Sequence, residues 1–144
     1  IPGEVVLNGT IRTFEEPVRR RIHRELASLA SGVARGLGVT ADCSVHRGYP
    51  PTVNDAGMSD RVRAVAREAG LRVVAQEPSM GAEDMSLVLR EVPGCYLFLG
   101  THDPSTGARR NNHAARFDID ERALPLGADL WVRLAGSLGG AASC

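Results

Sequence analysis

The chain has 144 residues, and 43% of them are hydrophobic, which is enough for a packed core in one medium-sized or two small domains. Its formal net charge is zero, so bulk electrostatics favours neither nucleic acid nor a membrane surface as a partner. No apolar run reaches the ~20 residues of a membrane span, no signal peptide is visible, and three cysteines do not suggest a disulfide framework, so we expect a cytoplasmic protein.

The first third of the chain has a strand–helix–strand pattern. Residues 5–12 are rich in β-branched side chains and predict a strand. Thr13, two acids and Pro17 then mark the start of a helix. Apolar residues at three- and four-residue spacing predict its buried stripe: Val18, Ile22, Leu26, Leu29, Val33 and Leu37. Gly36 and Gly38 are expected to end the helix, and residues 40–47 predict a second strand.

The opposite face of this helix carries four arginines: Arg19, Arg20, Arg24 and Arg35. Such a row fits two descriptions. It can be a basic docking surface, or it can be an ordinary solvated helix face, and charge patterning alone favours the solvated face.

A loop separates this unit from the rest of the chain. Gly48-Tyr49-Pro50-Pro51-Thr52-Val53-Asn54-Asp55 breaks all periodicity, and its paired prolines stiffen it. An interdomain hinge and an active-site loop both need such stiffness. We therefore place a domain boundary here, with residues 1–47 on one side and residues 48–144 on the other.

Helices and strands continue to alternate after the boundary. An amphipathic helix ends at Gly70, residues 71–75 predict a short strand, and a helix runs from the acidic pair Glu83-Asp84 to about Arg90. Residues 95–100 predict an apolar strand. A last helix has four leucines at intervals of four on its expected buried face: Leu126, Leu130, Leu134 and Leu138. This alternation predicts the α/β fold class.

His113 lies in the loop between the last predicted strand and the last predicted helix. The mouth of an α/β sheet is where such folds collect ligands, and imidazole suits zinc and similar ions. A single histidine without a nearby partner histidine or carboxylate is, however, more often structural or solvated. Glu83 and Asp84 likewise have a simple explanation, because acids in a first turn stabilise the helix dipole.

Six segments in order and in register carry more information than any one residue. They are Pro2-Gly3-Glu4, Gly9-Thr10-Ile11-Arg12-Thr13-Phe14, Gly48 to Asp55, Met80-Gly81-Ala82-Glu83-Asp84, Val92-Pro93-Gly94 and His113 to Glu121. Together they resemble the amidohydrolase branch of a large metallopeptidase family. Its members include hippurate hydrolases, plant auxin-conjugate hydrolases, N-acyl amino acid deacylases and, more distantly, glutamate carboxypeptidases.

The resemblance implies a two-domain enzyme with two divalent metal ions, of zinc, manganese, cobalt or nickel. A lid domain inserted into the catalytic domain mediates homodimerisation and closes on a small N-acyl amino acid or amide substrate. Residues 1–47 would be the second half of the lid, a ferredoxin-like half, and residues 48–144 would be the last segment of the catalytic domain. By the same resemblance His113 is a metal ligand, Arg12 binds the substrate carboxylate, and Asn54, Gly81 and Glu83 line the substrate cleft.

The family's other metal ligands and its glutamate general base correspond to sequence before Ile1. One imidazole cannot hold a catalytic metal ion, since three protein ligands are the usual minimum. The resemblance therefore implies a metal-activated water attacking an amide bond in the intact enzyme, with this chain inactive alone. The alternative is a catalytically inert fragment or dimerisation module of the same family, and an unrelated metal-free α/β binding domain is a third option.

Overall fold

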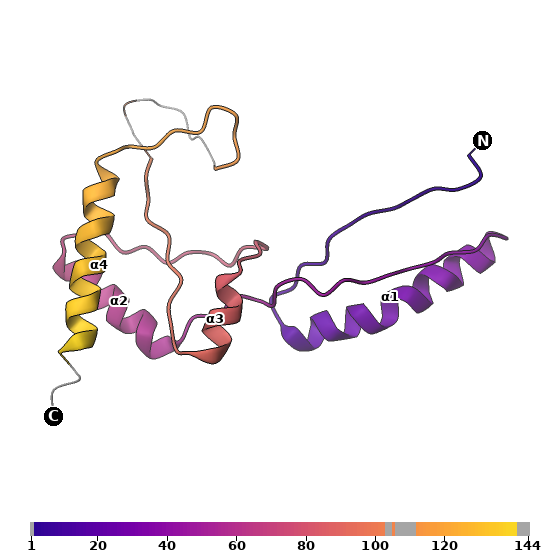
Figure 1. Ribbon diagram of the computed structural model, residues 1–144, viewed down its shortest axis with the longest axis horizontal. Coiled ribbons are helices and arrows are strands. Elements are labelled where there is room, and N and C mark those ends of the chain that lie inside the picture. Colours follow the sequence, from indigo (N-terminus) through magenta and orange to yellow (C-terminus); the bar gives the residue numbers. More distant parts are fainter. Residues whose placement is uncertain (1, 103–104, 106–111, 141–144) are drawn as a thin grey trace. The chain divides into compact units, whose positions relative to one another are not determined.

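A computed structural model describes residues 2–102, 105 and 112–140 of the chain. Its described part contains four helices: α1 (Glu16–Gly36), α2 (Ala56–Glu68), α3 (Met85–Glu91) and α4 (Ala123–Gly139) (Figure 1). These residues form two compact units. Unit 1 comprises the described residues of Ile1–Val53 and Gln76–Val92, and unit 2 those of Asn54–Ala75 and Pro93–Cys144.

Unit 1 is built on α1. Pro17 lies in its first turn, where a missing N–H costs nothing, and Gly38 adopts a left-handed backbone with φ of 72° just beyond its end. The predicted helix is thus confirmed, but much of its apolar stripe is exposed: Leu29 is 65% and Val33 56% accessible. Ala34 is the buried residue of α1, and Ile22 and Leu26 of the stripe are half-buried.

Unit 2 holds the hydrophobic core of the described residues, where α2 packs against α4. Its buried members are Val65, Ala66, Leu130 and Leu134, with Val62, Leu71, Val73 and Leu97 partly buried around them. Asp55 caps α2 by accepting a hydrogen bond from the Met58 N–H at 2.8 Å. The predicted end at Gly70 is confirmed, since Gly70 has φ of 77° and the following N–H of Leu71 bonds back to the Ala66 carbonyl.

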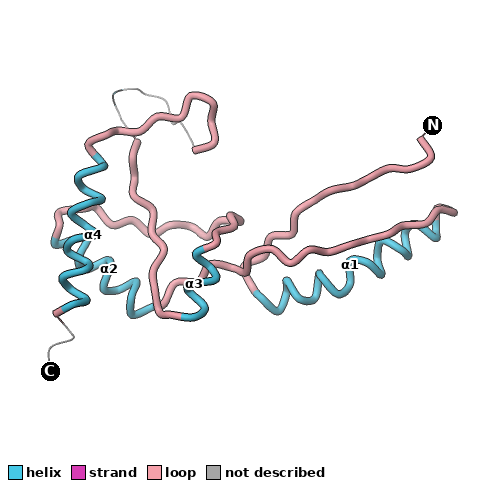
Figure 2. Tube along the Cα trace, viewed as in Figure 1, coloured by secondary structure: helices cyan, strands magenta, loops and turns pink. Residues whose placement is uncertain are grey.

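The four segments predicted as strands have no regular strand pairing in the described residues. Residues 5–12, 40–47, 71–75 and 95–100 run as loops without helical coil (Figure 2). A strand needs a hydrogen-bonded neighbour on at least one edge, and none of these segments has one here. The α/β class, and the domain boundary after residue 47, stay predictions.

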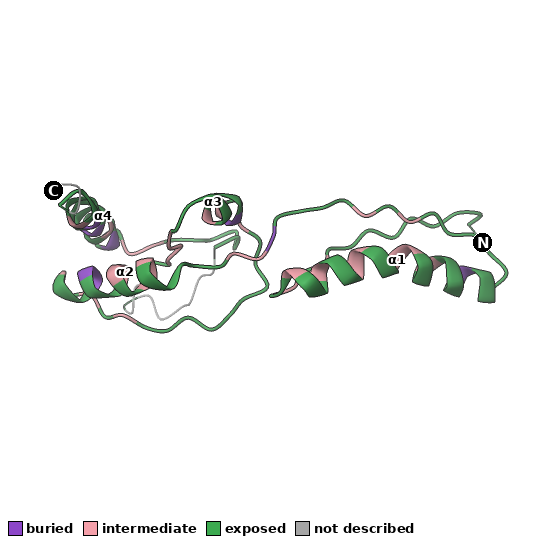
Figure 3. Ribbon diagram, turned by 90° about the horizontal axis from the view of Figure 1, so that it is seen from below, coloured by how far each residue is buried: buried purple, intermediate pink, exposed green. Residues whose placement is uncertain are grey.

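Little of the chain is deeply buried, as Figure 3 shows by the scarcity of buried residues along the ribbon. Large apolar side chains are exposed in both units: Leu7 is 91%, Trp131 69% and Val132 71% accessible. Much apolar surface is therefore left uncovered. None of the described helices combines the length and apolar character needed to cross a bilayer.

Candidate functional site

Asn54 ties the start of α2 to the segment that follows α3. Its side-chain Nδ2 donates to the Tyr96 carbonyl at 2.8 Å, and its Oδ1 accepts from the Tyr96 N–H at 2.8 Å. The side-chain amide thus pairs with both backbone groups of one residue, as a neighbouring strand would. The adjacent Asp55 N–H donates to the Gly94 carbonyl at 2.9 Å. Both polar ends of the Asn54 amide are engaged, which favours a positioning role for this residue.

We expect Asn54→Ala in the full-length protein to lower the free energy of unfolding by about 1–3 kcal/mol, since both hydrogen bonds to Tyr96 are lost. Urea denaturation followed by circular dichroism measures this loss. Asn54→Asp should lose a similar amount, because a carboxylate cannot donate to the Tyr96 carbonyl. Unchanged stability combined with weaker substrate binding would instead assign Asn54 to the substrate.

His113 is exposed and has a positive backbone φ of 74°, the one non-glycine residue in the described part with that conformation. L-residues adopt this left-handed region rarely, although histidine is among those enriched there. The turn that follows His113 is closed by the Phe117 N–H, which donates to the Ala114 carbonyl at 2.9 Å. Such outliers are a reason to examine a residue for function.

The loop that carries His113 is anchored where α4 begins. The Asp120 N–H donates to the Thr101 carbonyl at 2.9 Å, and the Asp120 carbonyl accepts from the Ala123 N–H at 2.9 Å. The Asp120 carboxylate accepts from Arg122 Nη2 at 2.6 Å and Nε at 2.8 Å, and this contact lowers the pKa of Asp120. The hydrogen bonds of Asp120 thus fix the position at which the loop joins α4.

Within the described ranges, no three or more His, Cys, Asp and Glu side chains lie close enough to hold one metal ion. His113 can supply one imidazole, but the divalent ions that the resemblance implies need further ligands. The residues described here do not complete such a site by themselves.

Arg12, Gly81 and Glu83 lie in unit 1, whereas Asn54 and His113 lie in unit 2. The guanidinium of Arg12 is exposed, and among the described residues its one hydrogen bond goes to the neighbouring Ile11 carbonyl, at 3.5 Å. Glu83 accepts from the Ser86 N–H at 3.2 Å through its carbonyl, in the turn that leads into α3. No hydrogen bond or ion pair joins Arg12, Gly81 and Glu83 to one another in the part of the chain that the structure describes.

The charge pattern predicts a solvated face for Arg19 of α1, but this residue holds a hydrogen-bonded position. Arg19 is 11% exposed and bonds Glu16 through Nε at 2.8 Å and Nη2 at 3.1 Å. Its Nη1 also donates to the Gly48 carbonyl at 3.2 Å. The bond from Arg19 lowers the pKa of Glu16. The three-residue spacing of the two side chains was the available signal.

Comparison with known proteins identifies the family. The model of "Peptidase family M20/M25/M40" matches residues 4–137. Thermostable carboxypeptidase 1 of Saccharolobus solfataricus is 36% identical over 129 residues, which cover 89% of this chain and 33% of that protein. N-acetyl-L-cysteine deacetylase of Bacillus subtilis is 34% identical over 86% of this chain and 29% of its own length.

A plant relative matches more of the chain. IAA-amino acid hydrolase ILR1-like 4 of Arabidopsis thaliana is 29% identical over 94% of this chain and 32% of that protein. The chain thus spans about a third of the length of the curated relatives it matches. No solved structure matches it. Since the family model covers nearly the whole chain, the chain belongs to peptidase family M20/M25/M40.

Proposed function

We propose that this chain is part of a hydrolase that cleaves the amide bond of N-acyl amino acids or related conjugates. The family match over residues 4–137 carries this proposal. The names of two relatives support it, because one is an N-acetyl-L-cysteine deacetylase and the other an IAA-amino acid hydrolase. Both names describe release of an amino acid from an acyl group.

Two residues are proposed to bind the metal and the substrate. His113 is proposed as one imidazole ligand of a divalent-metal site whose other ligands lie outside the described residues. Its exposure on an anchored loop supports this role. Arg12 is proposed to hold the substrate carboxylate. Its guanidinium is exposed and forms no ion pair with a described acid, so its planar fork is free to meet a carboxylate through two hydrogen bonds.

The remaining assignments are also proposals. Gly81 and Glu83 would line the substrate cleft, and Asn54 would do so or would position the loop, as its two bonds to Tyr96 favour. Residues 1–47 would belong to a lid that forms a homodimer. The enzyme would act in the cytoplasm, with two zinc, manganese, cobalt or nickel ions as its cofactors. The second candidate is an inert dimerisation module of the same family.

Chelation tests the proposal in the full-length protein. With N-acetyl amino acids as substrates, a metal chelator is expected to reduce hydrolysis at least about tenfold, and adding back one of the four metals should restore it. The 144-residue chain alone should show no turnover and only weak zinc binding by calorimetry. An unchanged rate of hydrolysis in the presence of the chelator would exclude metal dependence. No hydrolysis by the metal-loaded protein would favour the inert module.

A further inference from the structure

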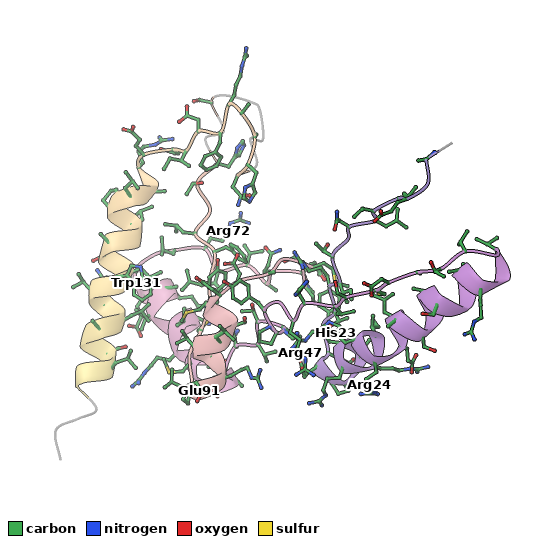
Figure 4. The ribbon with its side chains drawn as sticks, turned by 45° about the vertical axis from the view of Figure 1, so that its right-hand side comes forward. His23, Arg24, Arg47, Arg72, Glu91 and Trp131 are labelled. Atoms are coloured by element: carbon green, nitrogen blue, oxygen red, sulfur yellow. The ribbon has the colours of Figure 1, made fainter. Side chains whose placement is uncertain are left out.

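Unit 1 contains a pocket whose lining includes three arginines and a histidine. It has a volume of about 270 Å³ and is lined by Arg20, His23, Arg24, Val45 and Arg47. We call this the cationic pocket. Figure 4 shows His23 and Arg24 on α1 beside Arg47, which comes from the segment that follows the helix. Val45 supplies the single apolar side chain of its lining.

Two features of the sequence build this pocket. Arg20 and Arg24 are four residues apart on α1, so their side chains lie on one face of the helix. The returning segment is held against the same helix by the hydrogen bond from Arg19 to the Gly48 carbonyl. That bond places Arg47, the residue before Gly48, beside the other two guanidinium groups. The pocket therefore follows from the anchor of Arg19 and does not depend on unit 2.

The arginines of the cationic pocket differ from their neighbours on α1. Arg19 is paired with Glu16, and Arg21 with Glu25 at 3.0 Å. Arg20, Arg24 and Arg47 have no ion pair or hydrogen bond to any described residue. Like charges four residues apart on a helix repel each other. The three arginines thus share one pocket, and the nearby Glu16 carboxylate, whose pKa Arg20 also helps to lower, is already bonded to Arg19.

We propose that the cationic pocket binds a compact phosphate-bearing anion of diphosphate size. Guanidinium groups meet phosphate oxygens through paired, charge-assisted hydrogen bonds, and three of them can hold several oxygens at once. The volume lies just below the ~300–1000 Å³ of sites for drug-sized ligands, which suits a small polyanion. Neither Arg12 nor His113 lines the pocket, and the proposal goes beyond the proposed amide hydrolysis.

Calorimetric titration of the full-length protein with inorganic pyrophosphate at low ionic strength tests this site. We expect one saturable site with a Kd below about 1 mM and at least about tenfold weaker binding of acetate, which carries one charge. Arg24→Gln combined with Arg47→Gln should weaken pyrophosphate binding at least about tenfold, which corresponds to ~1.4 kcal/mol. Arg21→Gln is the matched control, since Arg21 lies on the same helix but is paired with Glu25. It should change the affinity less than about twofold.

Three results would overturn the proposal. The first is pyrophosphate binding that persists in the double variant, because the ligand would then sit elsewhere, for instance on a bound metal ion. The second is an equal loss in Arg21→Gln, which would reflect only the overall charge of the helix. The third is equal affinity for acetate and pyrophosphate. Should the double variant fail to fold, the single variants Arg24→Gln and Arg47→Gln carry the test, each with an expected loss of about threefold.

Discussion

Replacement of Arg12 by alanine in the full-length protein is expected to lower kcat/KM for an N-acyl amino acid by roughly 30- to several-thousand-fold. The variant would lose a charge-assisted, two-pronged contact, and breaking such a contact while the partner charge stays buried costs roughly 2–5 kcal/mol. In the structure Arg12 is exposed and makes no ion pair with a described acid. Its removal should therefore change the free energy of unfolding of the isolated chain very little. Steady-state kinetics measures the loss.

Two controls separate substrate binding from support of the backbone. Arg12→Lys should recover only part of the activity, because a point charge cannot reproduce the planar fork of guanidinium. The loss in Arg12→Ala should also shrink for a substrate whose carboxylate is amidated, since no anion remains to be held. Equal losses with the acid and the amide would show that Arg12 supports the fold or the dimer.

The second large effect is expected at His113. His113→Asn in the full-length protein should reduce turnover about 10- to 100-fold or more and lower the metal content, as changes in or around a metal's ligands commonly do. Asparagine is the better replacement because it tolerates the left-handed backbone that His113 adopts, with φ of 74°. Kinetics and metal analysis of the purified variant measure the two effects.

A comparison of three replacements isolates the backbone from the imidazole. His113→Gly should fold as well as His113→Asn, because glycine adopts this conformation freely. His113→Ala should be less stable by about 1–2 kcal/mol, since the left-handed conformation is unfavourable for alanine. If His113→Asn kept more than about a tenth of the activity with full metal content, the residue would have a structural role.

Helices were the part of this fold that sequence patterns predicted. The spacing of apolar residues located α1, α2 and α4, and Gly38 and Gly70 were correctly read as helix ends. Burial along α4 was predicted only in part: Leu130 and Leu134 are buried, but Leu126 is 46% exposed and Leu138 43%. A leucine repeat predicts which face of a helix is apolar. How much of that face is buried depends on the element that packs against it.

Long-range contacts were not predictable in the same way. The hydrogen bonds between Asn54 and Tyr96 join residues far apart in sequence, and no sequence periodicity predicts them. Segments such as 95–100 have strand-like composition, but pairing requires a partner edge, which composition does not supply. The five candidate site residues came from family resemblance, because a lone histidine or a surface arginine carries little information by itself.

The core of unit 2 also constrains the order in which the chain can fold during synthesis. Val65 and Ala66 of α2 are covered by Leu130 and Leu134 of α4, and the intervening chain contributes residues 76–92 to unit 1. At ~5–20 residues per second, a ribosome needs several seconds between making the two helices. During that interval the apolar face of α2 lacks Leu130 and Leu134, and the cluster members already made are Leu71, Val73 and Leu97. All residues of unit 1 have been made once Val92 is added, whereas unit 2 still lacks α4. The nascent chain therefore passes through a stage in which the apolar face of α2 is incompletely covered and can aggregate or bind a chaperone.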